Sequence, residues 1–589
     1  MSLYRILWPA CVLAWAAAAA DSVDYIVVGG GTAGLLVANR LSANSENSVA
    51  IVDPGTDERD KSGRVKPIDW VETLGMPVAK THTTVAQKEA DGRQIGMLSG
   101  QGIGGTSLIN GMTYIRGDVA EFDAWEKDLG NPGWNWKTML EYYKKVERFQ
   151  APEDWQVDSG ATYEPSFHTS DGDLHVGFIP DLINGTFYDH TVDGWDAVGL
   201  PKNKDANTGT TRGFDVFPQT IDSKANKRWD AATAFFWPVD ETRSNLELHN
   251  GTVHKILWTK PCKRNSNMRA SGVEYKAPGG EMIELMARKE VILAAGSLRS
   301  PLILENSGIG HAPLLRDNGI DVVVDLPGVG ENLIDQPLSI MAYKGSFQVE
   351  GYSPYSIFAT AQDLFGDDTQ AVADESKAKI TEWAKQVVDG SHGALKTSVV
   401  EKLMQSQHDL IFSKNATLGE VVIAAQGDRF GSSHWELLPF SRGRIHIGPE
   451  RDIEKPTLDP RFLATDFDVA TQSAIAKLVR RFYTSKPMQG LATTQLEPKP
   501  EDVPPQDAND EQWAAWVRAK AGSNNHPLGS AAMLPRDMGG VVGPELKVYG
   551  TGNVRVVDAS VIPTQISGHL TATIYAVAQR AAEMILNSE

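Results

Sequence analysis

The sequence predicts a mixed α/β protein with more than one domain, and three observations predict it. A glycine-rich turn joins a short apolar run to a helical pattern close to the N-terminus. A second such turn follows the apolar run EVILAAG at 290–296. Between residues 331 and 519, helical and strand patterns are both present, as in ITEWAKQVV (380–388) and RGRIHIG (442–448). At 589 residues the chain is long enough for two or three domains.

The first turn lies in the segment DYIVVGGGTAGLLVANRLS. The β-branched run at 25–28 is typical of a buried parallel strand, and apolar residues recur at helical spacing from Leu35 onward. Between them stand Gly29, Gly31 and Gly34, in the order G-x-G-x-x-G. Glycines permit a tight turn and the approach of a pyrophosphate to the backbone, and the helix start offers free N–H groups. The segment therefore predicts a Rossmann-like dinucleotide site.

A second strand, SVAIVD, ends at Asp53, 24 residues after Gly29. An acidic residue at this distance accepts a hydrogen bond from a ribose hydroxyl and disfavours a 2′-phosphate. Asp53 therefore supports the dinucleotide site, but this motif alone leaves FAD and NAD both open.

Two further glycine segments, GQGIGGTSLINGMTYIR (100–116) and GSLRSPLILENSGIG (296–310), can wrap a cofactor. Together with the N-terminal turn and two C-terminal histidines, they resemble the glucose–methanol–choline (GMC) family of flavin oxidoreductases over nearly the whole mature chain. The second segment fits the family signature throughout, whereas the first departs from it at Gln101. The sequences at 435–443 and 538–565 resemble the glucose oxidase and glucose dehydrogenase branch.

The resemblance implies an FAD-binding domain and a substrate-binding domain built on a mostly antiparallel sheet with helices behind it. We expect the FAD-binding domain to be discontinuous, at 22–155, 215–330 and 520–589, with the substrate-binding domain at 156–214 and 331–519. Some relatives tether the flavin through a histidine, and since Ile109 stands at the matching position we expect non-covalent FAD. By position, the resemblance assigns these residues to the cofactor: Gly29, Gly31, Thr32, Ala33, Gly34, Asp53, Thr106, Asn110, Gly111, Thr113, Val253, Asp558, Ala559 and Leu570.

Oxidation of an alcohol by a flavin requires a hydride acceptor and a base for the hydroxyl proton. A neutral imidazole suits that proton near neutral pH. The resemblance places His526 and His569 together over the flavin, with His526 as the main base. Ser567 is expected to cap the helix after His569, whose positive end would favour negative charge on the reduced flavin. Glu420 could orient one of the histidines.

Asn524 and Trp435 match residues that contact substrate in the sugar-oxidising relatives. Two charged residues of those relatives are replaced here by Gly522 and Ser433. Their loss should cost a hydroxyl-rich substrate several kcal/mol, at about 1.5–3 kcal/mol per charged hydrogen bond, which disfavours glucose. A less polar alcohol or a natural-product intermediate fits as well. The alternative is a non-redox cyclase of a polyketide pathway with FAD as a structural ligand, as a few family members are.

The net charge of −19, without a cluster of basic residues, argues against nucleic acid as a partner. Residues 1–20 resemble a secretory signal peptide that is too short to span a membrane, so we expect a secreted protein. Sequons at Asn184, Asn250 and Asn415 agree with that expectation. The mature chain would keep one cysteine, Cys262, and hence no internal disulfide. No spacing of His, Cys, Asp or Glu predicts a metal site.

Overall fold

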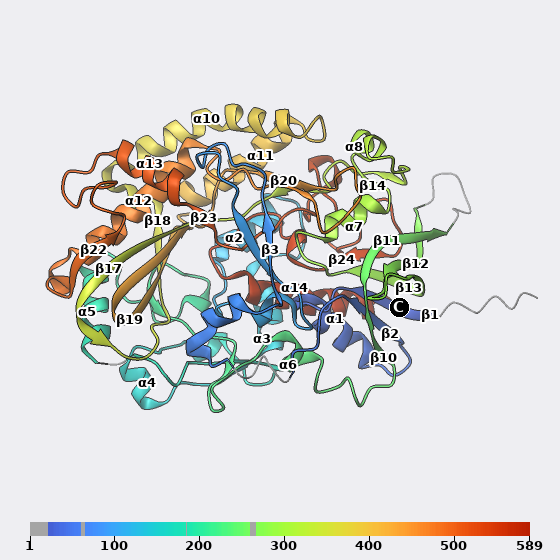
Figure 1. Cartoon of the computed structure of the whole chain (residues 1–589), viewed down its shortest axis with the longest axis horizontal. Coiled ribbons are helices and arrows are strands. Elements are labelled where there is room, and N and C mark those ends of the chain that lie inside the picture. The colour runs from blue at the N-terminus through green and yellow to red at the C-terminus, as the bar shows by residue number, and fades with distance from the viewer. Residues whose placement is uncertain (1–21, 60–64, 184, 260–266, 589) are drawn as a thin grey trace, which may run out of the picture.

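The computed structural model describes residues 22–59, 65–183, 185–259 and 267–588. It is a mixed α/β structure with two large sheets (Figure 1). The predicted signal peptide, the sequon at Asn184 and Cys262 lie outside the described residues. Asn250 and Asn415 are both exposed, which is compatible with glycosylation. Their glycosylation stays a prediction.

The first sheet has a parallel core that places the predicted dinucleotide turn at its carboxyl edge. Its strand order is β10-β2-β1-β13-β12-β11, and β24 also pairs with β13. The pairs among β10, β2, β1, β13 and β24 are parallel, whereas β11 and β12 form an antiparallel extension. The strands are β1 Ser22–Val28, β2 Val49–Asp53, β10 Leu246–Asn250, β11 Thr252–Thr259, β12 Arg269–Lys276, β13 Met282–Leu293 and β24 Val554–Val556.

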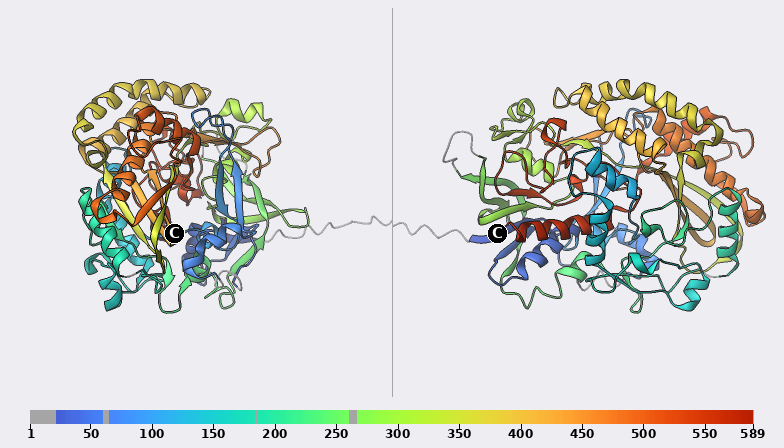
Figure 2. Two further views of the ribbon diagram at one scale, coloured as in Figure 1. Left: turned by 60° about the vertical axis from the view of Figure 1, so that its left-hand side comes forward. Right: turned by 180° about the vertical axis from the view of Figure 1, so that it is seen from behind.

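Helix α1 (Thr32–Ser42) follows β1 and packs against the C-terminal helix α14 (Leu570–Leu586). The right-hand view of Figure 2 shows α14 in red beside α1 in blue. The strand at 25–28, the helix after it and the strand that ends at Asp53 are thus as predicted. Packing of the two helices brings the last segment of the chain to the N-terminal turn.

The second sheet is antiparallel, with the order β22-β17-β19-β18-β7 and with β23 paired to β17. Its central element β19 folds back on itself as a hairpin. The two ends of the hairpin meet where the N–H of Leu437, just after β19, donates to the carbonyl of Leu418 at 2.8 Å. One arm of β19 pairs with β18 and the other with β17. The strands are β7 Gly213–Val216, β17 Pro337–Val349, β18 Tyr355–Thr360, β19 Thr417–Glu436, β22 Ala492–Glu497 and β23 Gly522–Ser523.

Helices α10 to α13 cover the outer side of this sheet (Figure 1). The predicted helix at 380–388 lies inside α10, and its apolar residues Ile380, Trp383, Ala384 and Val387 are buried. The strand predicted within 442–448 is β20, but all of its residues are buried, so the exposure does not alternate. The α-helices not yet given are α2 Val119–Lys127, α3 Trp136–Val146, α4 Asp154–Asp158, α5 Thr186–Ala197, α6 Ala231–Phe235, α7 Ser300–Asn306, α8 Ala312–Asp317, α9 Ala361–Phe365, α10 Thr369–Gly390, α11 Thr397–His408, α12 Asp466–Tyr483 and α13 Asp510–Lys520.

The smaller sheets connect loops around the two large ones. Their strands are β3 Ala79–Thr83, β4 Gly96–Gly100, β5 Glu147–Phe149, β6 Leu174–Val176, β8 Ile221–Asp222, β9 Lys227–Arg228, β14 Ile309–Gly310, β15 Val324–Asp325, β16 Glu331–Leu333, β20 Gly443–His446 and β21 Thr457–Asp459. The two-domain division stays a prediction. Strand β7 of the second sheet crosses the boundary that we expected at 215, and β23 lies beyond the one expected at 520.

A buried imidazole joins α7, which follows the first sheet, to β16 and β20. His446 Nδ1 lies 2.7 Å from Glu305 and its Nε2 lies 3.2 Å from Glu331. Burial alone would lower the pKa of His446, but the two carboxylates outweigh it and raise the pKa to about 10. Because the pKa is raised above the unfolded value near 6.5, this ion pair stabilises the fold fully below pH 6.5. The contribution is lost as the pH rises through 10.

Replacing His446 by glutamine should therefore lower the free energy of unfolding at pH 7 by about 3–5 kcal/mol, as breaking a buried ion pair does. The parental protein should lose stability between pH 7 and 10, and the variant should lose less over that window. Denaturant titrations across this pH range measure both effects. His392→Asn, at an exposed position, is the control. A variant that keeps the parental decline with pH would refute the assignment.

Candidate active site

The glycine turn packs too closely for a side chain at two of its glycines. Gly29 has φ +110°, and a Cβ there would lie 2.4 Å from the carbonyl oxygen of Ala294. A Cβ on Gly34 would lie 1.9 Å from the oxygen of Gly29. The N-cap residue, Gly31, brings no side-chain hydrogen bond to the helix. The first N–H groups of α1 therefore remain available to an anion such as a pyrophosphate.

Asp53 closes β2 beside this turn. One carboxylate oxygen accepts from the N–H of Gly30 at 2.7 Å, and the other accepts from the N–H of Gly55 at 2.6 Å. Burial raises the pKa of Asp53, although these two N–H groups oppose that shift. Each carboxylate oxygen keeps a further lone pair, so the side chain can also accept from a ribose hydroxyl.

The first-signature segment forms the next wall. Gly105 packs so closely on the turn that a Cβ there would lie 2.7 Å from the Cα of Gly31. Asn110 accepts from Arg228 at 2.8 Å and from the N–H of Met112 at 3.1 Å, and it donates to Thr571 at 3.1 Å. Asn110 thus ties this wall to the first turn of α14.

The C-terminal contribution to the cradle is a buried aspartate. Asp558 accepts from the N–H of Gly296 at 2.9 Å and from the hydroxyl of Ser300 at 2.5 Å. These bonds hold β24 against the second glycine turn and bring Ala559 to the ligand side. Burial raises the pKa of Asp558.

One cavity of about 440 Å³ runs from the cradle to both histidines. Of the sequence-predicted cofactor residues, Gly34 alone is not in its wall, because it packs beneath the turn. The predicted residues that line it are Gly29, Gly31, Thr32, Ala33, Asp53, Thr106, Asn110, Gly111, Thr113, Val253, Asp558, Ala559, Leu570, Trp435, Asn524, His526 and His569.

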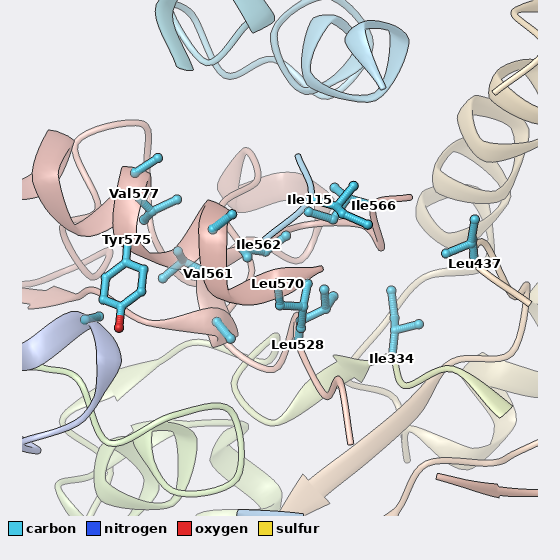
Figure 3. Packing of buried hydrophobic residues seen from close by; sticks show 14 of the residues in the cluster. Ile115, Ile334, Leu437, Leu528, Val561, Ile562, Ile566, Leu570, Tyr575 and Val577 are labelled. Carbon is cyan, nitrogen blue, oxygen red and sulfur yellow. The ribbon is translucent and has the colours of Figure 1, made fainter. Parts of the chain in front are cut away.

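The two imidazole rings lie with their centroids 5.4 Å apart and nearly perpendicular. Leu528 and Leu570 follow the two histidines closely in sequence, and Figure 3 shows them in one packed cluster. The indole of Trp435 lies edge-on to His569, with centroids 5.9 Å apart. A pair of histidines from remote segments is thus held against a shared aromatic wall.

Hydrogen bonds fix the tautomer of His526. Gln336 donates its amide N–H to the carbonyl of Leu437 at 3.2 Å, so its oxygen is the atom that faces His526. That oxygen lies 2.8 Å from Nδ1 of His526, and the amide nitrogen of Asn524 lies 3.0 Å from the same Nδ1. Because Asn524 also donates to the oxygen of Gln336 at 2.9 Å, we assign the shorter contact as the hydrogen bond and the proton to Nδ1. The lone pair is left on Nε2. Sequence analysis missed Gln336, because it lies 190 positions before His526 in a loop without a motif.

Burial, with a smaller contribution from the neighbouring His569, lowers the pKa of His526 to about 3. The imidazole is therefore neutral at neutral pH. A neutral ring with its proton on Nδ1 can accept a proton at Nε2.

His569 pairs with an acid, as the sequence suggested. Its Nε2 lies 2.9 Å from Glu420, which also accepts from Ser356 at 2.5 Å. Its backbone N–H donates to Ile115 at 3.0 Å. The contact between Glu420 and a histidine is thus confirmed.

The predicted cap of the last helix is wrong. His569 is the N-cap residue of α14, and it makes no side-chain capping bond. Ser567 instead donates its hydroxyl and its N–H to the buried carboxylate of Glu121 at 3.0 and 2.9 Å. The buried acid competes for Ser567 and leaves the N–H groups of α14 without a side-chain cap.

The two proposed substrate residues have different surroundings. Asn524 donates to Gln336 at 2.9 Å and its amide nitrogen lies 3.0 Å from His526. Trp435 is buried, and its indole N–H has no acceptor among the described residues. The ring of Trp435 lines the cavity, but its indole nitrogen is itself buried. Ser433 also lines the cavity, whereas Gly522 does not.

Models of the GMC oxidoreductase family match residues 23–338 and 439–578. The chain belongs to the GMC oxidoreductase family. It is 46% identical to the glucose oxidase-like protein fsoC of Humicola fuscoatra, over 97% of this chain and 96% of that protein. It is 32% identical to a glucose oxidase of Aspergillus carbonarius, over 97% and 93% of the two chains.

The solved structure of an FAD-dependent oxidoreductase from Chaetomium thermophilum is 28% identical to this chain in sequence and superposes with a TM-score of 0.85. The match covers 96% of this chain and 99% of the solved chain. A fungal aryl-alcohol oxidase structure, at 24% identity and a TM-score of 0.83, shows the same fold. The cradle of this GMC oxidoreductase fits FAD: an open helix start, a half-buried acid that can accept from a ribose hydroxyl and a polar wall lead to the histidine pair.

Within the described residues, no helix is both long and apolar enough to cross a membrane. In the same residues, no group of three or more His, Cys, Asp and Glu is arranged to hold a metal ion.

The tautomer assignment predicts the effect of a change at Gln336. Replacing it by leucine removes the acceptor for Nδ1 and should lower the rate constant of flavin reduction by about 10–100-fold, as the loss of one buried hydrogen bond allows. Gln336→Glu keeps an acceptor but adds a negative charge, which should raise the pKa of His526 and move the acid limb of the pH–rate profile upward. Rapid-mixing kinetics across pH measure both. An unshifted limb in Gln336→Glu would contradict the assignment.

Proposed function

We propose that this protein oxidises the CH–OH group of a small molecule, with His526 as the base. One observation carries the proposal: the histidine pair and the dinucleotide cradle line the same cavity. Family membership supports the oxidoreductase class, and the fit of the cradle supports FAD as the cofactor. Bound FAD would supply the acceptor for the hydride of the carbinol carbon.

The chain's own residues supply the proton chemistry. The alcohol donates its hydroxyl proton to Nε2 of His526, which is neutral and fixed by Gln336. His569, whose Nε2 pairs with Glu420, lines the same cavity and would bind the same oxygen through its Nδ1. As the C–H bond breaks with its electron pair, the C–O bond becomes a carbonyl, so the substrate loses one hydride and one proton.

The first turn of α14 supports the reduction electrostatically. Leu570 and Thr571 line the cavity at the start of this helix, whose first N–H groups have no side-chain cap. A helix start favours negative charge nearby. This part of the proposal keeps the predicted role of the helix, although the predicted cap is replaced.

We further propose that FAD is held without a covalent bond, since Ile109, which lines the cavity, offers no nucleophile. Denaturation followed by ultrafiltration should leave all flavin in the filtrate. Secretion also belongs to this proposal, on the strength of the N-terminal sequence and the exposed sequons. Flavin that stays with the chain after denaturation would contradict non-covalent binding.

The test of the function is anaerobic. Purified yellow protein is mixed with a panel of primary alcohols and sugars, and the flavin absorbance is followed. At least one compound should bleach the flavin and yield its aldehyde or ketone. If none does so, oxidation is not the function.

A further inference from the structure

The inner face of the second sheet continues beyond the histidines as an apolar surface. In the register of β17 with β19, Leu338 stands opposite Trp435, Ile340 opposite Ser433 and Ala342 opposite Gly431. Side chains two residues apart share one face of a strand. Leu338, Ile340 and Ala342 therefore lie on the face that carries Trp435 into the cavity wall.

An exposed side chain extends this surface outward from the cavity. Leu338, Val422 and Ser433 line the cavity, and Ile340 is 51% exposed one step beyond Leu338. Outside the sheet, Val71 is 59% exposed in the segment 67–75, between the lining residues Trp70 and Leu74. Among described residues, these are the large apolar side chains that are more than half exposed. Both adjoin residues that line the site.

Charged residues border this surface at its far end and on the neighbouring strand β22, where Glu497 stands opposite Ala342. Along β17 and β19 the first charged pair on this face is Lys344 opposite Arg429, two steps beyond Ile340. Near the histidines, Glu420 is engaged by His569 and Ser356, and Asn524 by Gln336. Among the described residues of β17 and β19, the polar side chain that lines the cavity on this wall without a hydrogen-bonded partner is therefore Ser433.

Such a wall suits one class of substrate. A sugar would bring several hydroxyls against apolar side chains and leave them unpaired, at about 1–3 kcal/mol each. An apolar skeleton would instead remove Leu338, Ile340 and Val422 from water. A single hydroxyl at one end would meet the histidine pair.

We propose that the substrate is an alcohol with an extended apolar skeleton, which lies along Leu338, Ile340 and Val422 with its hydroxyl at His526 and His569. This proposal rests on the proposed function and names its substrate class. The surface is continuous with the site that the histidines define, so its occupant is the remainder of the molecule being oxidised. The carbinol carbon gives its hydride to FAD and the hydroxyl gives its proton to His526, as above.

The experiment uses the FAD-bound protein, anaerobic mixing, a series of primary 1-alkanols of increasing length, and D-glucose. The ratio of the flavin reduction rate to the dissociation constant should rise about fourfold per added methylene, the ratio that corresponds to about 0.8 kcal/mol per buried CH₂. Glucose should not bleach the flavin at the same concentrations.

Ile340→Asn should flatten the rise for the longer alkanols and leave the shortest ones unchanged, whereas Ile340→Leu, the matched control, should keep it. A parental slope in Ile340→Asn would overturn the placement of the skeleton. Bleaching by glucose at lower concentrations than by any alkanol would overturn the substrate class and leave the proposed function standing. Failure of every compound to bleach the flavin would overturn both.

Discussion

Replacing His526 by alanine is expected to lower the rate constant of anaerobic flavin reduction by about 10²–10⁴-fold, the range typical of a lost general base. The neutral ring offers Nε2 to the substrate because Gln336 holds the proton of Nδ1 and burial keeps the pKa low. Without the imidazole, the hydroxyl proton loses the acceptor that His526 Nε2 provides beside the substrate. Rapid mixing with a substrate that bleaches the parental flavin measures the loss.

Two controls separate this chemistry from a structural effect. The variant should keep its FAD, because the dinucleotide cradle is built from other segments. Added imidazole should restore part of the rate by filling the space left by the side chain, which a misfolded site would not permit. Near-parental reduction in His526→Ala would remove the base from this account.

Replacing Asp53 by alanine should weaken FAD binding by about 100-fold, since hydrogen bonds to a charged group contribute about 1.5–3 kcal/mol each. The change removes the acceptor for a ribose hydroxyl and leaves the N–H groups of Gly30 and Gly55 without their carboxylate. The dissociation constant of FAD, measured by flavin fluorescence on titration of the apoprotein, shows the effect.

Asp53→Asn is the matched variant, because it keeps an oxygen acceptor of the same shape without the charge. It should bind FAD with an affinity between those of the parental protein and Asp53→Ala. If Asp53→Ala holds FAD with the parental dissociation constant, the acid is not at the ribose.

The elements around the dinucleotide cradle could be predicted from the sequence because their signals are local. The strand, Gly29, the helix start and Asp53 lie within one short stretch, and each is required there by sterics or hydrogen bonding. The fold class followed from that stretch and from the family resemblance. The roles assigned to individual residues within the site remain predictions.

What the sequence could not provide depends on contacts between remote segments. Serine is a residue type that commonly caps helices, but Ser567 donates its hydroxyl to the buried acid Glu121 instead. Gln336 has no motif, yet it sets the tautomer of His526 across 190 positions. The apolar face around Ile340 appears only once β17 is paired with the folded-back β19. Local patterns do not encode these pairings.

The most direct measurement of the central claim is single-turnover flavin reduction with an alcohol that is deuterated at its carbinol carbon. If the C–H bond is cleaved as flavin is reduced beside His526, deuteration should slow the bleaching, and His526→Ala should lower its rate constant by about 10²–10⁴-fold. A protein whose flavin stays oxidised with every alcohol, while it converts a substrate without redox change, would contradict the account and favour a cyclase.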